Sequence, residues 1–297
     1  MYGTVKALLE NENFPERYPL DMETSNKEYL NINNPIERYF IYKSGNIDKQ
    51  SVYRGAVRYR ESKQSICQSI VDCDSCDLIK DVYSLLWSDA IADSENSTID
   101  GQHGETMTSL QHSLNLAVKR IETEEERKSR GRRKVSLAYQ IELLSCENNF
   151  LARASEINGL ESFALMYHTL GNMIPVPPMF NSSRSNFGTD DYWDITLTKI
   201  KKWYDTHDNA VIAELLHKKV ETDQSVECCV KWLSWFGGWP NFIEKNYLGD
   251  FVEGQNTEPI RFKPNSADDI ESFFEVCSCL INKRGQRMVN ELQRITA

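Results

Sequence analysis

No apolar run in this sequence approaches the ~20 residues that a membrane-spanning helix requires. The first residues, MYGTVKALLENENF, also lack the long apolar region of a signal peptide. The eight cysteines follow no spacing typical of secreted scaffolds, which favours free thiols. We therefore expect a cytoplasmic protein that has no membrane partner.

The sequence also lacks the short motifs of several large enzyme classes. Neither the glycine pattern of dinucleotide sites nor that of P-loops is present, and G-x-S-x-G and H-E-x-x-H are missing too. Cys73 and Cys76 form a C-x-x-C, but no second cysteine pair has the spacing of a zinc site, so buried helical cysteines are favoured over zinc ligands. We predict no cofactor and leave a divalent metal as the open alternative.

Acidic residues outnumber basic ones in the chain as a whole, 44 Asp/Glu against 34 Lys/Arg, which gives a net charge of −10. Such a chain repels phosphate backbones, so a nucleic-acid site requires a local basic patch. The segment 119–134 (KRIETEEERKSRGRRK) holds eight Lys/Arg against four Glu. We interpret it as a solvated helix face with i,i+4 ion pairs that ends in a charged turn at Gly131. A local nucleic-acid patch is the alternative.

Helical periodicity dominates the rest of the sequence, and strand signals are few. Only 51–60 (SVYRGAVRYR) suggests a hairpin and 173–176 (MIPV) a short extended piece, while 88–105 is predicted to be an exposed loop. The predicted helices cover 78–87, 107–121, 135–147, 155–167, 190–205, 211–219, 226–236 and 266–294. Gly237 and Gly238 are expected to end the helix over 226–236, and Pro240 to lie in the first turn of a following helix. The predicted fold class is mainly α (α+β with minor β), a single large helical domain over 1–297 with a long Pro/Asn-rich loop. A subdivision into an N-terminal α+β part, 1–100, and a helical core, 101–297, is the alternative.

The Pro/Asn-rich loop begins with HTLGNMIPVPPMFNSSRSN at residues 168–186. Its prolines fix φ and remove backbone donors, which predicts a stiff path that holds polar side chains in place. The candidate binding residues in it are His168, Asn172, Asn181 and Arg184. A helix–helix crossover in which asparagines close turns is the structural alternative.

The segments YHTLGNMIPVP and DYWDITLTKIKKWY resemble an uncharacterised family of bacterial and mobile-element proteins, a domain of unknown function. LLWSDAIAD at 85–93 is similar to a further segment of that family. The resemblance covers about residues 80–295 and implies no particular activity.

HTLGNMIPVP followed by FN is also similar to the second half of His-Asn-His nuclease motifs, in which Asn172 and Asn181 match the asparagines. The resemblance implies a divalent metal and a histidine that activates water, and His168 is the candidate catalytic residue. The upstream histidine pair of that motif is missing from the preceding fifty residues.

Two further groups are candidates for a site. His103 and His112 flank the start of the helix over 107–121, whose amides can receive an anion, although an ordinary capped helix is favoured. Trp232, Trp235 and Trp239 are side chains on which nucleic-acid bases could stack, but their helical spacing favours packing in the hydrophobic core.

The resemblance to the uncharacterised family implies a prokaryotic or phage protein, and the loop residues favour one that binds nucleic acid, a nucleotide or another anionic ligand through residues 168–194. In this hypothesis His168 and Arg184 contact phosphate, Asn172 and Asn181 orient the loop, and Asp191 or Asp194 caps a helix or holds a metal. One alternative is a non-catalytic interaction protein, an inhibitor in phage–host conflict with a protein partner that it binds through its acidic surface. A metal-dependent nuclease is the other alternative.

Overall fold

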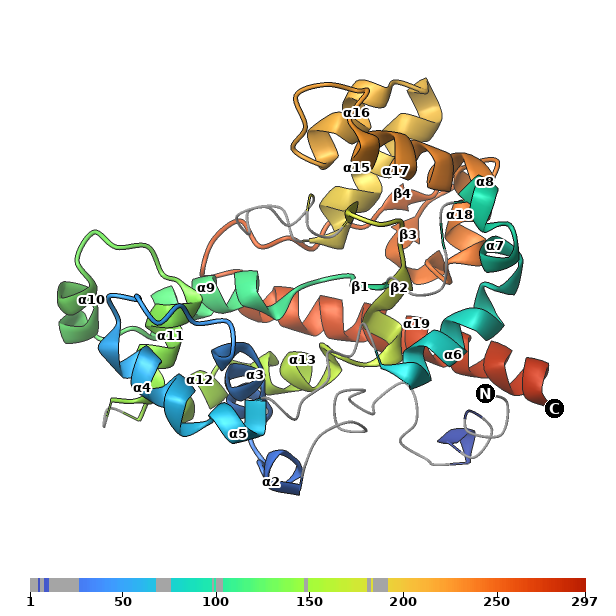
Figure 1. Ribbon diagram of the computed structural model, residues 1–297. Helices are drawn as coiled ribbons and strands as arrows, with labels where there is room; N and C mark the ends of the chain where they lie inside the picture. Colours follow the sequence, from blue (N-terminus) through green and yellow to red (C-terminus); the bar gives the residue numbers. More distant parts are fainter. Residues whose placement is uncertain are drawn as a thin grey trace.

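The long helix α19 (Ile270–Thr296) runs through the middle of the molecule, and elements from both halves of the chain pack against it (Figure 1). The computed structural model describes residues 5, 8–10, 27–67, 76–97, 99, 104–146, 149–180, 183 and 192–297. Buried apolar side chains from Val5 to Leu292 form one hydrophobic cluster. One core therefore joins both halves of the chain.

The elements of the first half are α2 (Lys27–Leu30), α3 (Pro35–Ser44), α4 (Arg54–Ser62), α5 (Gln64–Cys67), α6 (Asp77–Leu86), α7 (Ser88–Ala92), α8 (Ser94–Ser97), β1 (Gly104–Thr106), α9 (Leu110–Ile121), α10 (Glu124–Arg130) and α11 (Leu137–Leu144). Those of the second half are α12 (Phe150–Ser155), α13 (Leu160–Met166), the 3-10 helix η3 (Leu170–Asn172), β2 (Met173–Pro175), α15 (Trp193–Thr206), α16 (Asn209–Leu215), α17 (Gln224–Trp235), α18 (Trp239–Lys245), η5 (Gly249–Phe251), β3 (Val252–Glu253), β4 (Glu258–Pro259) and the final helix α19. The predicted class, mainly α with minor β, is confirmed.

The strands are short and antiparallel. β1 pairs with β2 so that Gly104 faces Pro175 and Thr106 faces Met173, and β3 pairs with β4. The predicted extended piece at 173–176 is therefore confirmed as β2, and its partner β1 comes from a segment about 70 residues earlier.

η3 lies unusually close to α19, and Gly171 makes this possible. A Cβ atom at Gly171 would lie 2.0 Å from the carbonyl oxygen of Ile281 and 2.9 Å from the backbone nitrogen of Gly285. Only glycine fits at such a backbone–backbone contact. The Pro/Asn-rich segment thus begins as a tightly packed part of the core.

The hairpin predicted for 51–60 is wrong, because residues 54–60 belong to the helix α4. A carboxylate oxygen of Glu142, on α11, accepts hydrogen bonds from the backbone nitrogens of Gly55 (2.8 Å) and Ala56 (3.3 Å). This contact satisfies donors at the beginning of the helix. It comes from a residue far along the chain, so local sequence gives no sign of it.

The exposed loop predicted for 88–105 is also wrong over most of its length. The segment contains α7, α8 and β1, and Ala90 and Ile99 are buried. The Trp235 side chain donates to a carboxylate oxygen of Asp93 at 3.0 Å, and α8 packs against α17. Tertiary contacts order a sequence that is polar enough to read as a loop.

Most predicted helices are present, with shifted ends. The helix expected over 155–167 begins only at Leu160, because Gly159 has φ +81° and separates α12 from α13. Gly237 has φ +70° after α17, and Pro240 lies in the first turn of α18, as predicted. Trp232 and Trp239 are buried, as the core interpretation requires, and Trp235 is half-buried.

None of the described helices is both long and apolar enough to cross a membrane. The described cysteines are free thiols. Cys76 of the C-x-x-C is buried, and Cys73 lies outside the described residues.

Candidate functional site

The described part of the Pro/Asn-rich segment, 168–180, is built into the core. His168 is 4% exposed. Its ring stacks on Tyr167 with 4.0 Å between centroids and meets the edge of Tyr42 at 4.8 Å. Its surroundings are aromatic side chains, with Arg38 and Tyr39 lining the same small cavity of about 20 Å³.

Asn172 is fully buried, and its side-chain amide bonds to backbone only. Its Oδ1 accepts from Thr108 N at 3.1 Å, and its Nδ2 donates to the carbonyls of Thr108 at 3.1 Å and Tyr167 at 2.8 Å. The amide therefore joins η3 to the residues that lead into α9, where three buried backbone groups would otherwise lack partners.

A buried arginine that sequence reasoning missed holds the same segment from the other side. Arg284 is 0% exposed and donates to the carbonyls of Gly171 (2.8 Å), Met173 (2.7 Å) and Asn246 (3.0 Å). Burial lowers the pKa of Arg284 to about 10. Arg284 ties η3, β2 and the end of α18 to the central helix.

Asp194 lies in the first turn of α15 and lines a surface cleft of about 420 Å³. Its Oδ2 accepts from the backbone nitrogens of Phe262 (3.1 Å) and Lys263 (3.0 Å), while its buried Oδ1 has no hydrogen-bond partner. The other lining residues are Ile195, Thr198, Lys199, Arg261, Lys263 and Asn265. Lys199 pairs with Glu214 at 2.6 Å, and Arg261 forms no ion pair with any described carboxylate.

The structure brings three of the predicted residues into one neighbourhood. The centroid of the His112 ring lies 5.5 Å from that of Tyr192, the residue directly before α15. Thr108, which is hydrogen-bonded to Asn172, is also hydrogen-bonded to Cys277 on α19. Burial raises the pKa of the Cys277 thiol, and the nearby charge of Asp194 raises it further, whereas the hydrogen bond with Thr108 lowers it. His112, Asn172 and Asp194 thus surround the junction of α9, α15 and α19. His168 lies apart, against α3, and His103, Asn181, Arg184 and Asp191 lie outside the described residues.

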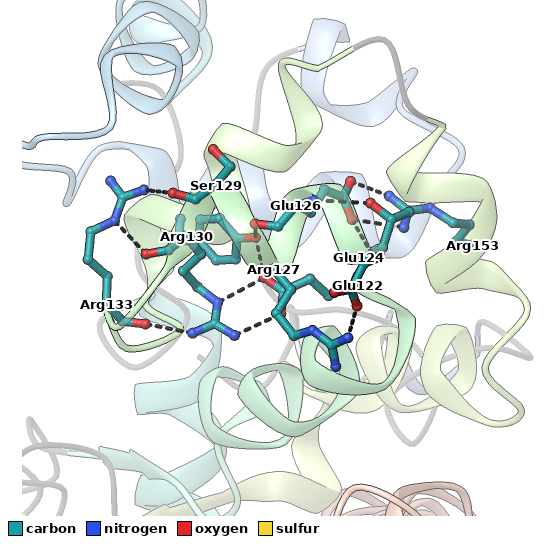
Figure 2. A network of polar contacts seen from close by, with 10 residues as sticks. Glu122, Glu124, Glu126, Arg127, Ser129, Arg130, Arg133 and Arg153 are labelled. Carbon is teal, nitrogen blue, oxygen red and sulfur yellow. Dashed lines mark hydrogen bonds and ion pairs between the residues drawn. The ribbon is translucent and has the colours of Figure 1, made fainter.

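The basic segment 119–134 forms a second polar centre around α10, at the left of Figure 1 and away from α16 and α17 at the top. Thr123 and Glu126 form a reciprocal capping box at the start of α10, and Glu126 also binds Arg153 at 2.6 and 3.0 Å. Arg130 forms a two-pronged ion pair with Glu122, with both bonds at 2.8 Å (Figure 2). The ion pairs predicted here are present, including the i,i+4 pair of Lys128 with Glu124.

The carboxylates of this network are held in their charged form. Burial opposes ionisation of Glu122, but hydrogen bonds from Arg130 and Tyr139 outweigh it and lower its pKa. For Glu126, burial is likewise outweighed, here mainly by Arg153, and the pKa is lowered. Several of the cations in 119–134 are therefore used to build the turn between α10 and α11.

The Arg133 side chain connects this turn to the beginning of α4. Its guanidinium lies 4.7 Å from the ring centroid of Tyr53, the residue before α4, and donates to the carbonyls of Ser129 (2.6 Å) and Arg130 (2.9 Å) (Figure 2). A guanidinium fixed by two carbonyls and an aromatic ring is preorganised. Arg133 thus brings the basic turn into contact with the residue that precedes α4.

Four further cations on α4 and the basic turn are exposed and form no ion pair with any carboxylate that the structure describes. Arg54 and Arg58 lie one turn apart on α4, and Arg132 and Lys134 flank Arg133. We call these five residues, Arg54, Arg58, Arg132, Arg133 and Lys134, the cationic face. Residues 27–67 and 119–134 together hold sixteen Lys/Arg and eight Asp/Glu, so the rest of a chain of net charge −10 carries −18.

A pocket of about 210 Å³ opens beside the cationic face, between α4, α10 and α11. Its lining residues are Tyr53, Glu125, Glu126, Ser129, Arg133, Tyr139, Glu142, Leu143 and Cys146. Tyr53 is only 6% exposed, yet its hydroxyl has no hydrogen-bond partner. Sequence reasoning missed this pocket because its walls meet only in the folded chain.

Comparison with protein-family models, with curated proteins and with solved structures found no match for this chain. The resemblances drawn from the LGNMIP and DYWDITL segments therefore stay predictions. Within the described ranges, no group of three or more His, Cys, Asp or Glu is arranged to hold a metal ion.

Proposed function

We propose that this protein binds nucleic acid through the cationic face, with phosphate groups contacting Arg54, Arg58, Arg132, Arg133 and Lys134. The observation that carries the proposal is that four of these side chains are exposed and form no ion pair with a described carboxylate, in a chain of net charge −10. Cations left unpaired on an otherwise acidic surface form a local phosphate-binding patch.

The network behind the face supports the proposal. Arg130, Arg153 and their glutamates fix the α10–α11 turn, so its outward cations are presented by a rigid base. Phosphate contacts made from such a base position the ligand without reading its sequence. The acidic remainder of the chain restricts the contact to this side.

The proposal is tested by fluorescence anisotropy with labelled single-stranded and duplex oligonucleotides. If five phosphates are contacted, affinity for a single strand falls roughly a hundredfold between about 50 and 200 mM salt. The Arg132→Ala/Lys134→Ala variant should bind more weakly and show a salt slope smaller by about 1.4. Lys219→Ala/Lys231→Ala is the matched control, because it removes the same charge from exposed sites on α16–α17. Equal weakening by both variants, or no binding by the wild type, would overturn the proposal.

A second candidate is the cleft at the start of α15, whose lining includes Asp194, a residue of the predicted 168–194 binding segment. Three cations, Lys199, Arg261 and Lys263, line its 420 Å³, within the size range of small-ligand sites, and favour a nucleotide or another small anion. Calorimetric titration with nucleoside mono- and triphosphates tests it. Arg261→Ala should abolish any heat of binding there and leave oligonucleotide binding at the cationic face unchanged.

A further inference from the structure

The pocket beside the cationic face differs sharply in charge from its rim. The cation at the rim is Arg133, which is flanked in the sequence by the exposed Arg132 and Lys134, whereas the walls carry the carboxylates of Glu125, Glu126 and Glu142. Phosphate is attracted to the rim but repelled by the walls. The group that fits the interior is therefore neutral and bears hydrogen-bond donors.

The walls offer hydrogen-bonding capacity that the fold itself does not use. The Tyr53 hydroxyl is buried without a partner, which is uncommon for a buried polar group in a native fold. Glu142 uses Oε2 to cap α4, while its Oε1 makes no hydrogen bond in the described part of the chain. Glu125 forms no ion pair there either. Two carboxylate acceptors and one hydroxyl thus remain for a ligand.

The pocket also contains a flat platform. The Arg133 guanidinium lies over the Tyr53 ring and is fixed by the carbonyls of Ser129 and Arg130, so its plane is held in place. Proteins that recognise single-stranded nucleic acids commonly stack unpaired bases on aromatic rings or guanidinium planes.

We propose that this pocket receives one unpaired nucleobase that carries an amino group, while the neighbouring phosphates lie on the cationic face. The amino group donates to Glu125 or Glu142, and the Tyr53 hydroxyl bonds to the base edge. This inference rests on the proposed function and makes it more specific. The ligand is single-stranded or looped nucleic acid, because bases within a duplex remain stacked and paired.

Cytosine and uracil provide the sharpest test, because they share a ring shape and differ in an amino donor against a carbonyl acceptor. We would measure the binding of labelled oligocytidine, oligouridine and a duplex, each of about 12 nucleotides, a length within the range of single-strand sites. The wild type should prefer oligocytidine to oligouridine by roughly 5- to 100-fold, the range for one well-formed base contact. It should also bind the single strand more tightly than the duplex.

Single and double variants distinguish the contribution of the pocket to base preference from that of the cationic face to overall affinity. Tyr53→Phe and Glu125→Gln should bring the cytidine-to-uridine ratio close to one and leave oligouridine affinity within about twofold. Arg132→Ala/Lys134→Ala should weaken both oligomers and preserve the ratio. Unchanged thermal unfolding of Tyr53→Phe would show that the hydroxyl, not the fold, is responsible.

The outcomes are distinguishable. A wild type that binds all three ligands, with a ratio near one that Tyr53→Phe does not change, would refute the base pocket and leave the cationic face standing. A wild type that binds none of the ligands would refute both proposals.

Discussion

The contact between η3 and α19 predicts that Gly171→Ala is among the most destabilising single substitutions in this chain. The new Cβ would lie 2.0 Å from the Ile281 carbonyl oxygen, whereas ordinary van der Waals contact begins at 3.4 Å. The obstructing atoms belong to helix backbone, so no side chain can rotate away. The two elements must separate by about 1.4 Å along this contact.

That separation breaks more than one interaction. Arg284 donates to the Gly171 and Met173 carbonyls at 2.8 and 2.7 Å, and the displacement takes these bonds out of hydrogen-bond range. Overpacking costs about 1–3 kcal/mol, and a lost hydrogen bond to a charged group costs about 1.5–3 kcal/mol. We therefore expect the free energy of unfolding to fall by about 4 kcal/mol or more.

The assay is urea unfolding followed by tryptophan fluorescence and far-UV circular dichroism, at equal protein concentration. Gly45→Ala is the control, because the nearest atom to its added Cβ is 4.0 Å away and its φ of −56° suits alanine. It should change stability by less than about 1 kcal/mol. A Gly171→Ala protein within about 1 kcal/mol of the wild type would refute the close-contact argument.

Two further predictions concern buried polar groups. Asn172→Ala leaves three backbone groups without their side-chain partner. The free energy of unfolding should therefore fall by about 3 kcal/mol in the same urea assay. A fall of less than about 1 kcal/mol would contradict this reasoning. Glu126 has a lowered pKa, so its ion pair with Arg153 contributes fully above about pH 4.5 and is lost as pH falls below that value. The stability gap between the wild type and Glu126→Gln should therefore be about 2 kcal/mol at neutral pH and narrow in urea titrations below about pH 4. A gap independent of pH would argue against a charged Glu126.

Local patterns were enough to predict most of the helices. The stripe of apolar residues in α15 and the Gly237 and Pro240 signals around α17 and α18 depend on neighbouring residues alone. α4 was misread because Glu142, a distant residue, caps its beginning. The pairing of β1 with β2 spans about 70 residues and has no local signal either.

The candidate site was predictable only in part. The sequence shows that 119–134 is basic, and it contains Arg54 and Arg58 four residues apart, a spacing that places both on one helix face once 54–62 is helical. The contact of Arg133 with Tyr53 joins these two segments, and no sequence rule predicts it. Asn172 was predicted as a candidate binding residue, and the hydrogen bonds that the structure gives its side chain are all to backbone atoms.

The position of α19 also affects the order in which the chain can fold. This helix follows every other described element in the sequence, yet α6, α9, α13 and η3 all pack against it. During synthesis these earlier helices emerge before α19 can cover their apolar faces. The carbonyls of Gly171 and Met173 likewise emerge before Arg284, their hydrogen-bond donor, has been made. Contacts between distant parts of a chain form slowly, because long loops must close first. We therefore expect the nascent chain to expose apolar surface to chaperones until residues 270–296 have left the ribosome, and chaperone binding to fall once they have.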